Sequence, residues 1–242
     1  FFIPVRLVPQ DKPEVRFAFM ESNGEWYKPD VKSARYFKDL REEINSVLIN
    51  YQHGISFLHV APYTQIEAWT TAQGNEEINK NEIMLADGAL VGAMNSYESI
   101  RPFKSDDAHM IIMTKWDARK YDNEHQNLEE ALLYVSDDVL AATIRQQYQQ
   151  GYSAFNSLKI PPERKRLMRY CAGVIRGREI VTPNAELQMI LNRYRQNLWN
   201  WLYANATRSN PEVAQELVLF PPPPPPKIGL FQKVTSMLDK LM

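Results

Sequence analysis

Residues 109–114 read His-Met-Ile-Ile-Met-Thr, and this stretch decides the fold. Its four central residues are all apolar, whereas a strand with one solvent-exposed face would alternate between apolar and polar residues. The sequence therefore predicts a strand that is covered on both faces and lies inside a parallel sheet.

Working outward from this strand, apolar runs alternate with helical patterns. Two more strands are expected over residues 55–61 and 167–175, the second continuing past Gly177 through Val181. Apolar residues recur at intervals of three and four between residues 34 and 48 and again between 187 and 202, which is typical of helices with one buried face, while Gly88 and Gly92 weaken the pattern between 75 and 100. These segments predict helices over residues 30–50, 75–100, 127–150 and 184–206, with Thr182 and Pro183 as N-cap and first-turn pair of the last.

At the start of the chain, residues 3–8 and 15–20 form two strand-like runs around a polar turn. This spacing predicts an antiparallel hairpin. Together with the alternating order, it predicts an α/β fold. We expect a three-layer sandwich with a mostly parallel central sheet and an antiparallel edge hairpin, plus a C-terminal amphipathic helix.

The end of the chain has a different composition. Six consecutive prolines, residues 221–226, predict a stiff polyproline rod of about 19 Å. The chain then divides into an α/β domain over residues 1–206, a linker over 207–226 and an amphipathic helix over 227–242. We expect the helix to bind a groove on a partner protein, with membrane contact at most peripheral. Packing against its own domain is the alternative.

Composition excludes several classes of function. The 242 residues include 28 Lys and Arg against 29 Asp and Glu, so no basic surface for nucleic acid is expected. The single cysteine, Cys171, rules out an internal disulfide framework. No apolar stretch reaches about 18 residues, so we expect no transmembrane helix and a cytoplasmic location. The first residue is Phe1 instead of methionine, which favours a processed chain or a fragment.

The central strand leads into Thr114-Lys115-Trp116-Asp117. Ligands in open α/β sheets bind beyond the carboxyl ends of the strands, which is where these residues fall. A carboxylate there can accept hydrogen bonds from the ring N–H and the exocyclic amine of guanine, a pair of donors that adenine lacks. The motif resembles the guanine-specificity motif [NT]KxD of the P-loop GTPases. An ordinary surface loop is the alternative.

A second motif, Glu21-Ser22-Asn23-Gly24-Glu25, follows the hairpin and resembles the DxxG motif of the same family. The resemblance implies that Glu21, in place of aspartate, organises Mg²⁺ and that the backbone of Gly24 meets the γ-phosphate. It places Glu25 where many members carry a water-orienting glutamine. It also implies that Cys171-Ala172 supplies a backbone N–H to the guanine oxygen. A polar turn is the alternative for residues 21–25.

The phosphate-binding loop GxxxxGK[ST] of this family does not occur in the sequence. In the family order this loop, its strand and its helix precede residue 1. We therefore expect the rear part of a guanine-nucleotide-binding domain, with GTP or GDP and Mg²⁺ as ligands, acting as a regulatory or assembly subunit. GTPase activity is expected only if such a loop lies upstream.

Two other classes of function remain open. The same sheet could belong to a pseudo-GTPase that serves as a structural scaffold without nucleotide. The prolines could themselves be the ligand of an aromatic groove, which would make the protein an adaptor. The four histidines show no metal-ligand spacing and are interpreted as scattered core or surface residues.

Overall fold

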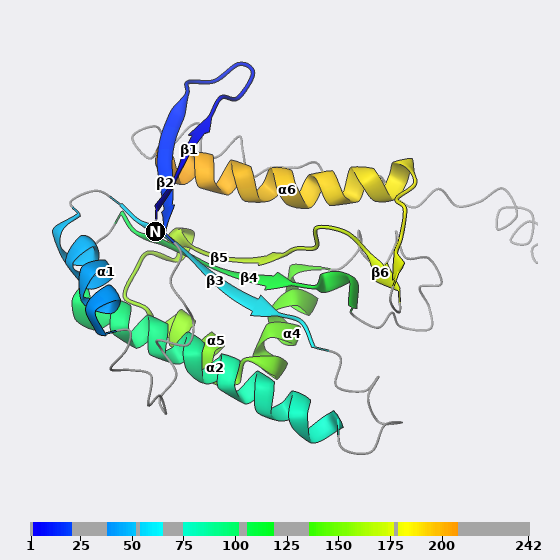
Figure 1. Cartoon of the computed structure of the whole chain (residues 1–242), viewed down its shortest axis with the longest axis horizontal. Helices are drawn as coiled ribbons and strands as arrows, with labels where there is room; N and C mark the ends of the chain where they lie inside the picture. The colour runs from blue at the N-terminus through cyan, green and yellow to red at the C-terminus, as the bar shows by residue number, and fades with distance from the viewer. Residues whose placement is uncertain are drawn as a thin grey trace, which may run out of the picture.

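A three-stranded parallel sheet lies at the centre of the structure, which is a computed structural model (Figure 1). It describes residues 2–20, 38–51, 54–64, 75–101, 106–118, 136–176 and 179–207. The strands lie side by side in sequence order and are β3 (Ser56–Pro62), β4 (Ala108–Thr114) and β5 (Lys165–Arg169). All residues of β4 except Thr114 are buried, as its unbroken apolar sequence predicts.

Helices cover both faces of this sheet (Figure 1). One face carries α2 (Asn75–Ile100), α4 (Asp137–Gln147) and α5 (Gln149–Ser157), and the opposite face carries α6 (Ala185–Ala206). Alternate side chains of β4 divide between the two layers. Ile111 and Met113 belong to the larger apolar core with α2, α4 and α5, while Met110 and Ile112 pack toward α6. The α/β architecture expected from the sequence is confirmed.

The hairpin forms a two-stranded antiparallel sheet of its own from β1 (Phe2–Leu7) and β2 (Val15–Met20). Among the residues described, no hydrogen-bonded pairing joins it to the parallel sheet. It stands beside the last turns of α6 (Figure 1). There the Tyr203 hydroxyl donates to the Pro13 carbonyl at 3.1 Å, and Phe19 meets Trp199 edge to face.

The third strand of the sheet is shorter than the sequence predicted. β5 ends at Arg169, and the expected continuation through Val181 is instead a separate ribbon of β6 (Ile175–Arg176) and β7 (Glu179–Ile180). The physical reason lies in the loop after β4, because the Trp116 N–H bonds to the Tyr170 carbonyl and closes the end of the strand. Residues 171–174 therefore form a loop outside the sheet.

Two helix boundaries also differ from expectation. The helical region predicted to end at residue 150 consists of α4 and α5, which are separated at Tyr148 and continue to Ser157. The break is stabilised from α2, because the Asp87 carboxylate accepts the Gln150 and Gly151 N–H groups at the start of α5. At α6 the N-cap is Asn184 and not Thr182, since its side chain accepts the Leu187 N–H at 2.7 Å.

Several expectations concern segments outside the described residues. They are the first part of the helix predicted over 30–50, the segment 119–135, the motif at 21–25, and the proline rod with the C-terminal helix. The structure describes the rest of the helix predicted over 30–50 as α1 (Lys38–Asn50). None of the helices that the structure describes is long and apolar enough to cross a bilayer.

Candidate functional site

The loop after β4 is a tight, well-anchored turn. Lys115 is exposed and has a φ of 54°, a left-handed conformation that is uncommon for a residue with a side chain. The turn continues into a single helical turn at Trp116–Ala118. Trp116, only 1% exposed, packs edge to face on Tyr63 with ring centroids 6.1 Å apart. This anchor fixes the position of Asp117, which is 8% exposed.

The loop after β5 lies against this turn. The Tyr170 N–H donates to the Met113 carbonyl at 2.8 Å, and the Trp116 N–H donates to the Tyr170 carbonyl at 3.3 Å. One residue further on, the Cys171 thiol accepts a hydrogen bond from the Asp117 backbone. The structure thus brings Asp117 together with Cys171 and Ala172, as expected for the carboxyl ends of neighbouring parallel strands.

Cys171 is a buried thiol whose environment keeps it protonated. Burial raises its pKa to about 12, the negative charge of Asp117 acts in the same direction, and the Asp117 backbone bond and the Arg195 guanidinium act against it. Nucleophilic or metal-binding chemistry needs the thiolate, which this pKa suppresses. Cys171 therefore packs as a small apolar core residue.

The remaining residues predicted for the site belong to the motif at 21–25. Glu21, Gly24 and Glu25 lie outside the described residues, so the proposed Mg²⁺ ligand and the phosphate contacts stay predictions. Within the described ranges, no group of three or more His, Cys, Asp or Glu side chains could hold a metal ion. The candidate site that the structure describes therefore consists of Thr114, Lys115, Asp117, Cys171 and Ala172.

One cluster was missed at the sequence level. His59 and His109, from neighbouring strands, are both buried and their Nε2 and Nδ1 atoms are 3.0 Å apart. Burial lowers the pKa of His59 to about 4. Burial and the charge of the neighbouring His59 together lower the pKa of His109 to about 2. Stacking of His109 on Phe57 at 4.5 Å completes an aromatic layer. The available signal was that His59 interrupts one apolar strand and that His109 begins another.

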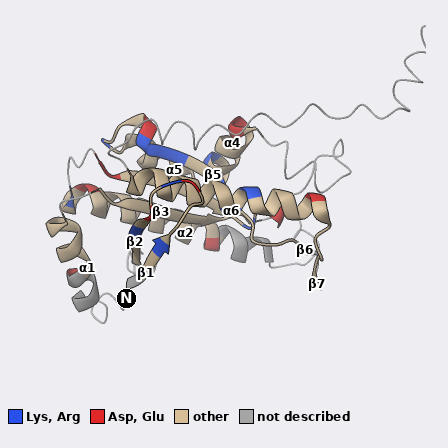
Figure 2. Ribbon diagram, turned by 90° about the horizontal axis from the view of Figure 1, so that it is seen from above, with Lys and Arg blue, Asp and Glu red and all other residues tan. Residues whose placement is uncertain are grey.

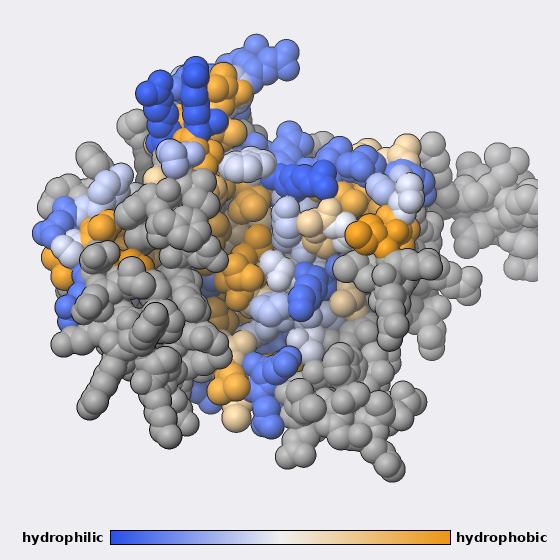
Figure 3. Space-filling model, viewed as in Figure 1, coloured by the Kyte–Doolittle hydropathy of each residue, from blue (hydrophilic) through white to orange (hydrophobic). Residues whose placement is uncertain are grey.

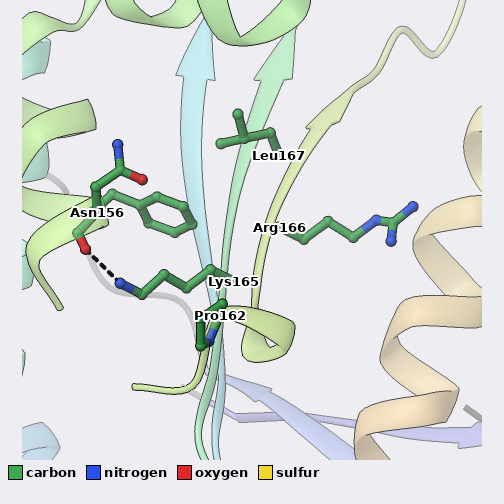
Figure 4. Close-up of a pocket in the computed structure, with 6 residues that line it drawn as sticks. Asn156, Pro162, Lys165, Arg166 and Leu167 are labelled. Carbon is green, nitrogen blue, oxygen red and sulfur yellow. Dashed lines mark hydrogen bonds between the residues drawn. The ribbon is translucent and has the colours of Figure 1, made fainter. Parts of the chain in front are cut away.

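A surface pocket of about 380 Å³ lies at the amino end of β5, the end opposite to the two loops. Figure 4 shows Lys165 reaching toward α5, where its Nζ donates to the Asn156 carbonyl at 2.7 Å, while Arg166 points toward α6. In Figure 2 much of the β5 ribbon has the blue of Lys and Arg. Because Lys165 already bonds to a helix carbonyl and Arg166 points elsewhere, the pocket has no convergent set of charged groups.

No protein-family model matches this chain, and no curated protein or solved structure was found to resemble it. The chemistry of the candidate site therefore rests on its own residues and geometry.

Proposed function

We propose that this chain is the rear part of a guanine-nucleotide-binding domain of the P-loop GTPase type, acting in the cytoplasm as a regulatory or assembly subunit. The observation that carries the proposal is the meeting of the Thr114–Asp117 turn and the Cys171-Ala172 loop at the carboxyl edge of the sheet. Only the resemblance of their motifs to those of the P-loop GTPases indicates that these two loops lie on the two sides of a guanine base.

The residues at this edge fit a guanine base. Asp117 provides the carboxylate for the two guanine donors, and its low exposure favours strong hydrogen bonds because competing water is reduced. Lys115 is exposed, so its aliphatic stem is available to lie on the face of a base. The proposed ligand is GDP or GTP with Mg²⁺, which would be held on the phosphate side by Glu21 and Gly24.

A strand and phosphate loop supplied from outside residues 1–242 would complete such a domain. The edge of β3 that faces away from β4 offers backbone groups with which this strand could pair. The Ala108 N–H donates to the Ile55 carbonyl and the Tyr63 N–H donates to the Thr114 carbonyl. Because backbone groups alternate along a strand, those of Ser56, Leu58 and Val60 face away from β4. Among the described residues no strand pairs with that edge.

The face of β3 on the α6 side is also open. Val60 is 59% exposed, although it lies in the middle of an apolar strand. Figure 3 shows apolar side chains gathered in a hollow over β3, between the hairpin and α2. A sheet strand of this composition is normally covered on both faces, so the open side supports the proposal that further structure packs there.

Base selectivity tests the proposal. GDP, ADP and XDP are titrated calorimetrically into the full-length protein and its variants. Wild type should prefer GDP, and Asp117→Asn should weaken GDP binding about ten- to hundredfold while favouring XDP. The loss corresponds to roughly 1.5–3 kcal/mol for a charge-assisted hydrogen bond. Lys115→Ala should weaken binding without changing which base is preferred.

Asp138→Asn is the matched control, because it makes the same chemical change on an exposed carboxylate of α4. It should leave all three affinities unchanged. If the wild-type protein binds no guanine nucleotide at millimolar concentration, the proposal is wrong. The chain would then be better described as a nucleotide-free scaffold.

A further inference from the structure

The outer edge of β5 is a second edge of the parallel sheet with unpaired backbone groups. β5 is the last strand in the order, and among the described residues it pairs only with β4. Just after the strand, the Tyr170 N–H donates to the Met113 carbonyl of β4. Because backbone groups alternate along a strand, the N–H and C=O groups of Leu167 and Arg169 face away from β4. Within the described ranges, no hydrogen bond reaches these outward groups.

The two sides of this edge differ in chemistry. Figure 4 shows Lys165 extended toward α5 and Arg166 extended toward α6. The pocket of about 380 Å³ lies on the α5 side, where its apolar lining comes from Phe155, Pro162 and Leu167. On the other side, Arg166 is exposed and forms no ion pair with a described residue. An apolar cavity and an unpaired cation thus border the same strand on opposite sides.

The charge of the edge indicates which kind of partner it fits. Residues 164–169 include four cations and no acidic residue. Arg169 has only a distant counter-ion, because Asp137 lies 3.8 Å away with its side chain 98% exposed. A second copy of this edge would place Arg166 against like charges, which is unfavourable across a pair of strands. An acidic segment would instead be attracted to the edge.

We propose that the outer edge of β5 binds an extended acidic segment of a partner protein as an added strand. The backbone of this segment pairs with the outward groups of Leu167 and Arg169. Successive side chains of an extended chain point to opposite faces, so a carboxylate meets Arg166 while the neighbouring apolar side chain enters the pocket. This interface does not depend on nucleotide binding, because the pocket lies at the end of β5 opposite to the candidate site.

A heptapeptide that alternates Glu and Val, with an acetylated start and an amidated end, is the probe. It is titrated into the whole chain and followed by amide NMR. The Leu167 and Arg169 amides should shift, and at saturation their hydrogen exchange should slow by about tenfold or more because they become paired. The Arg166 and Met168 amides are the internal control. They face β4 in the alternating pattern, so their exchange should change little.

Three changes distinguish an added strand from general attraction between charges. A peptide with Lys in place of Glu should cause no shifts at the concentration that saturates the acidic peptide. Methylation of the backbone nitrogens of the acidic peptide keeps its charge but removes its donors, and should weaken binding by about tenfold. Arg166→Gln should weaken binding about two- to fivefold, as for one exposed ion pair. Arg6→Gln, the matched change on an exposed hairpin arginine, should have no effect.

Slower exchange of the Leu167 and Arg169 amides with the acidic peptide alone would support the proposal. Equal binding of the Glu and Lys peptides, shifts without slower exchange, or no binding at millimolar peptide would each overturn it. Protection of these amides that rises with protein concentration in the absence of peptide would make a second copy the occupant. Protection at every concentration would mean that the chain's own residues cover the edge. Either result would also overturn the acidic partner.

Discussion

Gly151 is a position at which α5 lies close against α2. A Cβ at this position would lie 2.9 Å from both the Asp87 carboxylate and the Leu90 Cβ, closer than packed atoms tolerate. The Gly151 N–H also donates to the Asp87 carboxylate at 2.6 Å, so the two helices cannot separate without losing that bond. Gly151→Ala should lower the free energy of unfolding by about 1–3 kcal/mol.

Urea unfolding measures this effect, and Gly88→Ala is its control. Gly88 is also inside a helix, but a Cβ there meets nothing within 4 Å. Its replacement should therefore stabilise the protein by about 0.5–1 kcal/mol through helix propensity. Equal effects of the two substitutions would contradict the close approach at Gly151.

The buried histidine pair predicts how stability depends on pH. Both folded-state pKa values lie below the ordinary value near 6.5, so the unfolded chain takes up protons first as the pH falls. Stability is thus fully present above about pH 6.5 and is lost as the pH drops toward 4. For His59, the shift to about 4 corresponds to about 2 kcal/mol between pH 7.5 and pH 5.

Unfolding free energies at pH 7.5, 6.5, 5.5 and 5 test this dependence. Replacing both histidines by phenylalanine, which matches the stacked aromatic layer with Phe57, should flatten the profile over this range. A profile as steep in the double variant as in wild type would assign the pH dependence to other groups.

At the scale of elements, a buried ion pair joins α1, α2 and the start of β4. Arg101, just after α2, bonds to Asp107 at 2.6 Å and to the Leu48 and Tyr51 carbonyls at the end of α1. Asp107 also accepts the Ile55 N–H. Asp107→Ala would leave a buried guanidinium without its counter-ion and should cost about 3–5 kcal/mol.

Chemical denaturation measures the loss, and Asp137→Ala is the matched control. Asp137 also pairs with an arginine, but at 3.8 Å and with its side chain 98% exposed. Solvent screens such a pair, so its removal should change stability by less than about 1 kcal/mol. A small loss for Asp107→Ala would mean that water or other groups compensate the buried charge.

The elements that the sequence predicted well are those with a strong local pattern. The apolar run of β4 determines a whole strand, and the apolar positions of α6 at helical spacing determine a whole helix, without help from distant residues. The break at Tyr148 was not predictable, because the group that stabilises the start of α5 is Asp87 on another helix. The end of β5 likewise depends on Trp116 in a different loop.

The same distinction holds for the candidate site. The meeting of Asp117 with Cys171 followed only from the family resemblance, because the strand expected over residues 167–175 placed Cys171 and Ala172 inside the sheet and not at its carboxyl edge. The contact between Arg195 and the Ala172 carbonyl was not predictable, since it depends on how α6 lies across the sheet. Sequence motifs identify which chemical groups lie at strand ends, whereas the orientation of these groups depends on tertiary packing.

At the scale of the whole molecule, the α/β domain is anchored up to the end of α6. Leu202 and Tyr203 are buried in its last turns, and the Tyr203 hydroxyl ties the helix to the hairpin. Deleting residues 208–242 should therefore shift the melting temperature by less than about 2 °C, because this core is retained. Ending the chain after Trp201 should cost several kcal/mol, about 2–5 for each large core side chain.

The deletion also tests the expected role of the C-terminal segment. Its apolar positions recur at helical spacing after the six prolines, so the helix expected there would be buried either on a partner or on this domain. If the partner is a separate protein, the chain that ends at Thr207 should melt like the full chain and no longer co-purify with that protein. A large drop in melting temperature with association intact would place the segment in the core of its own domain.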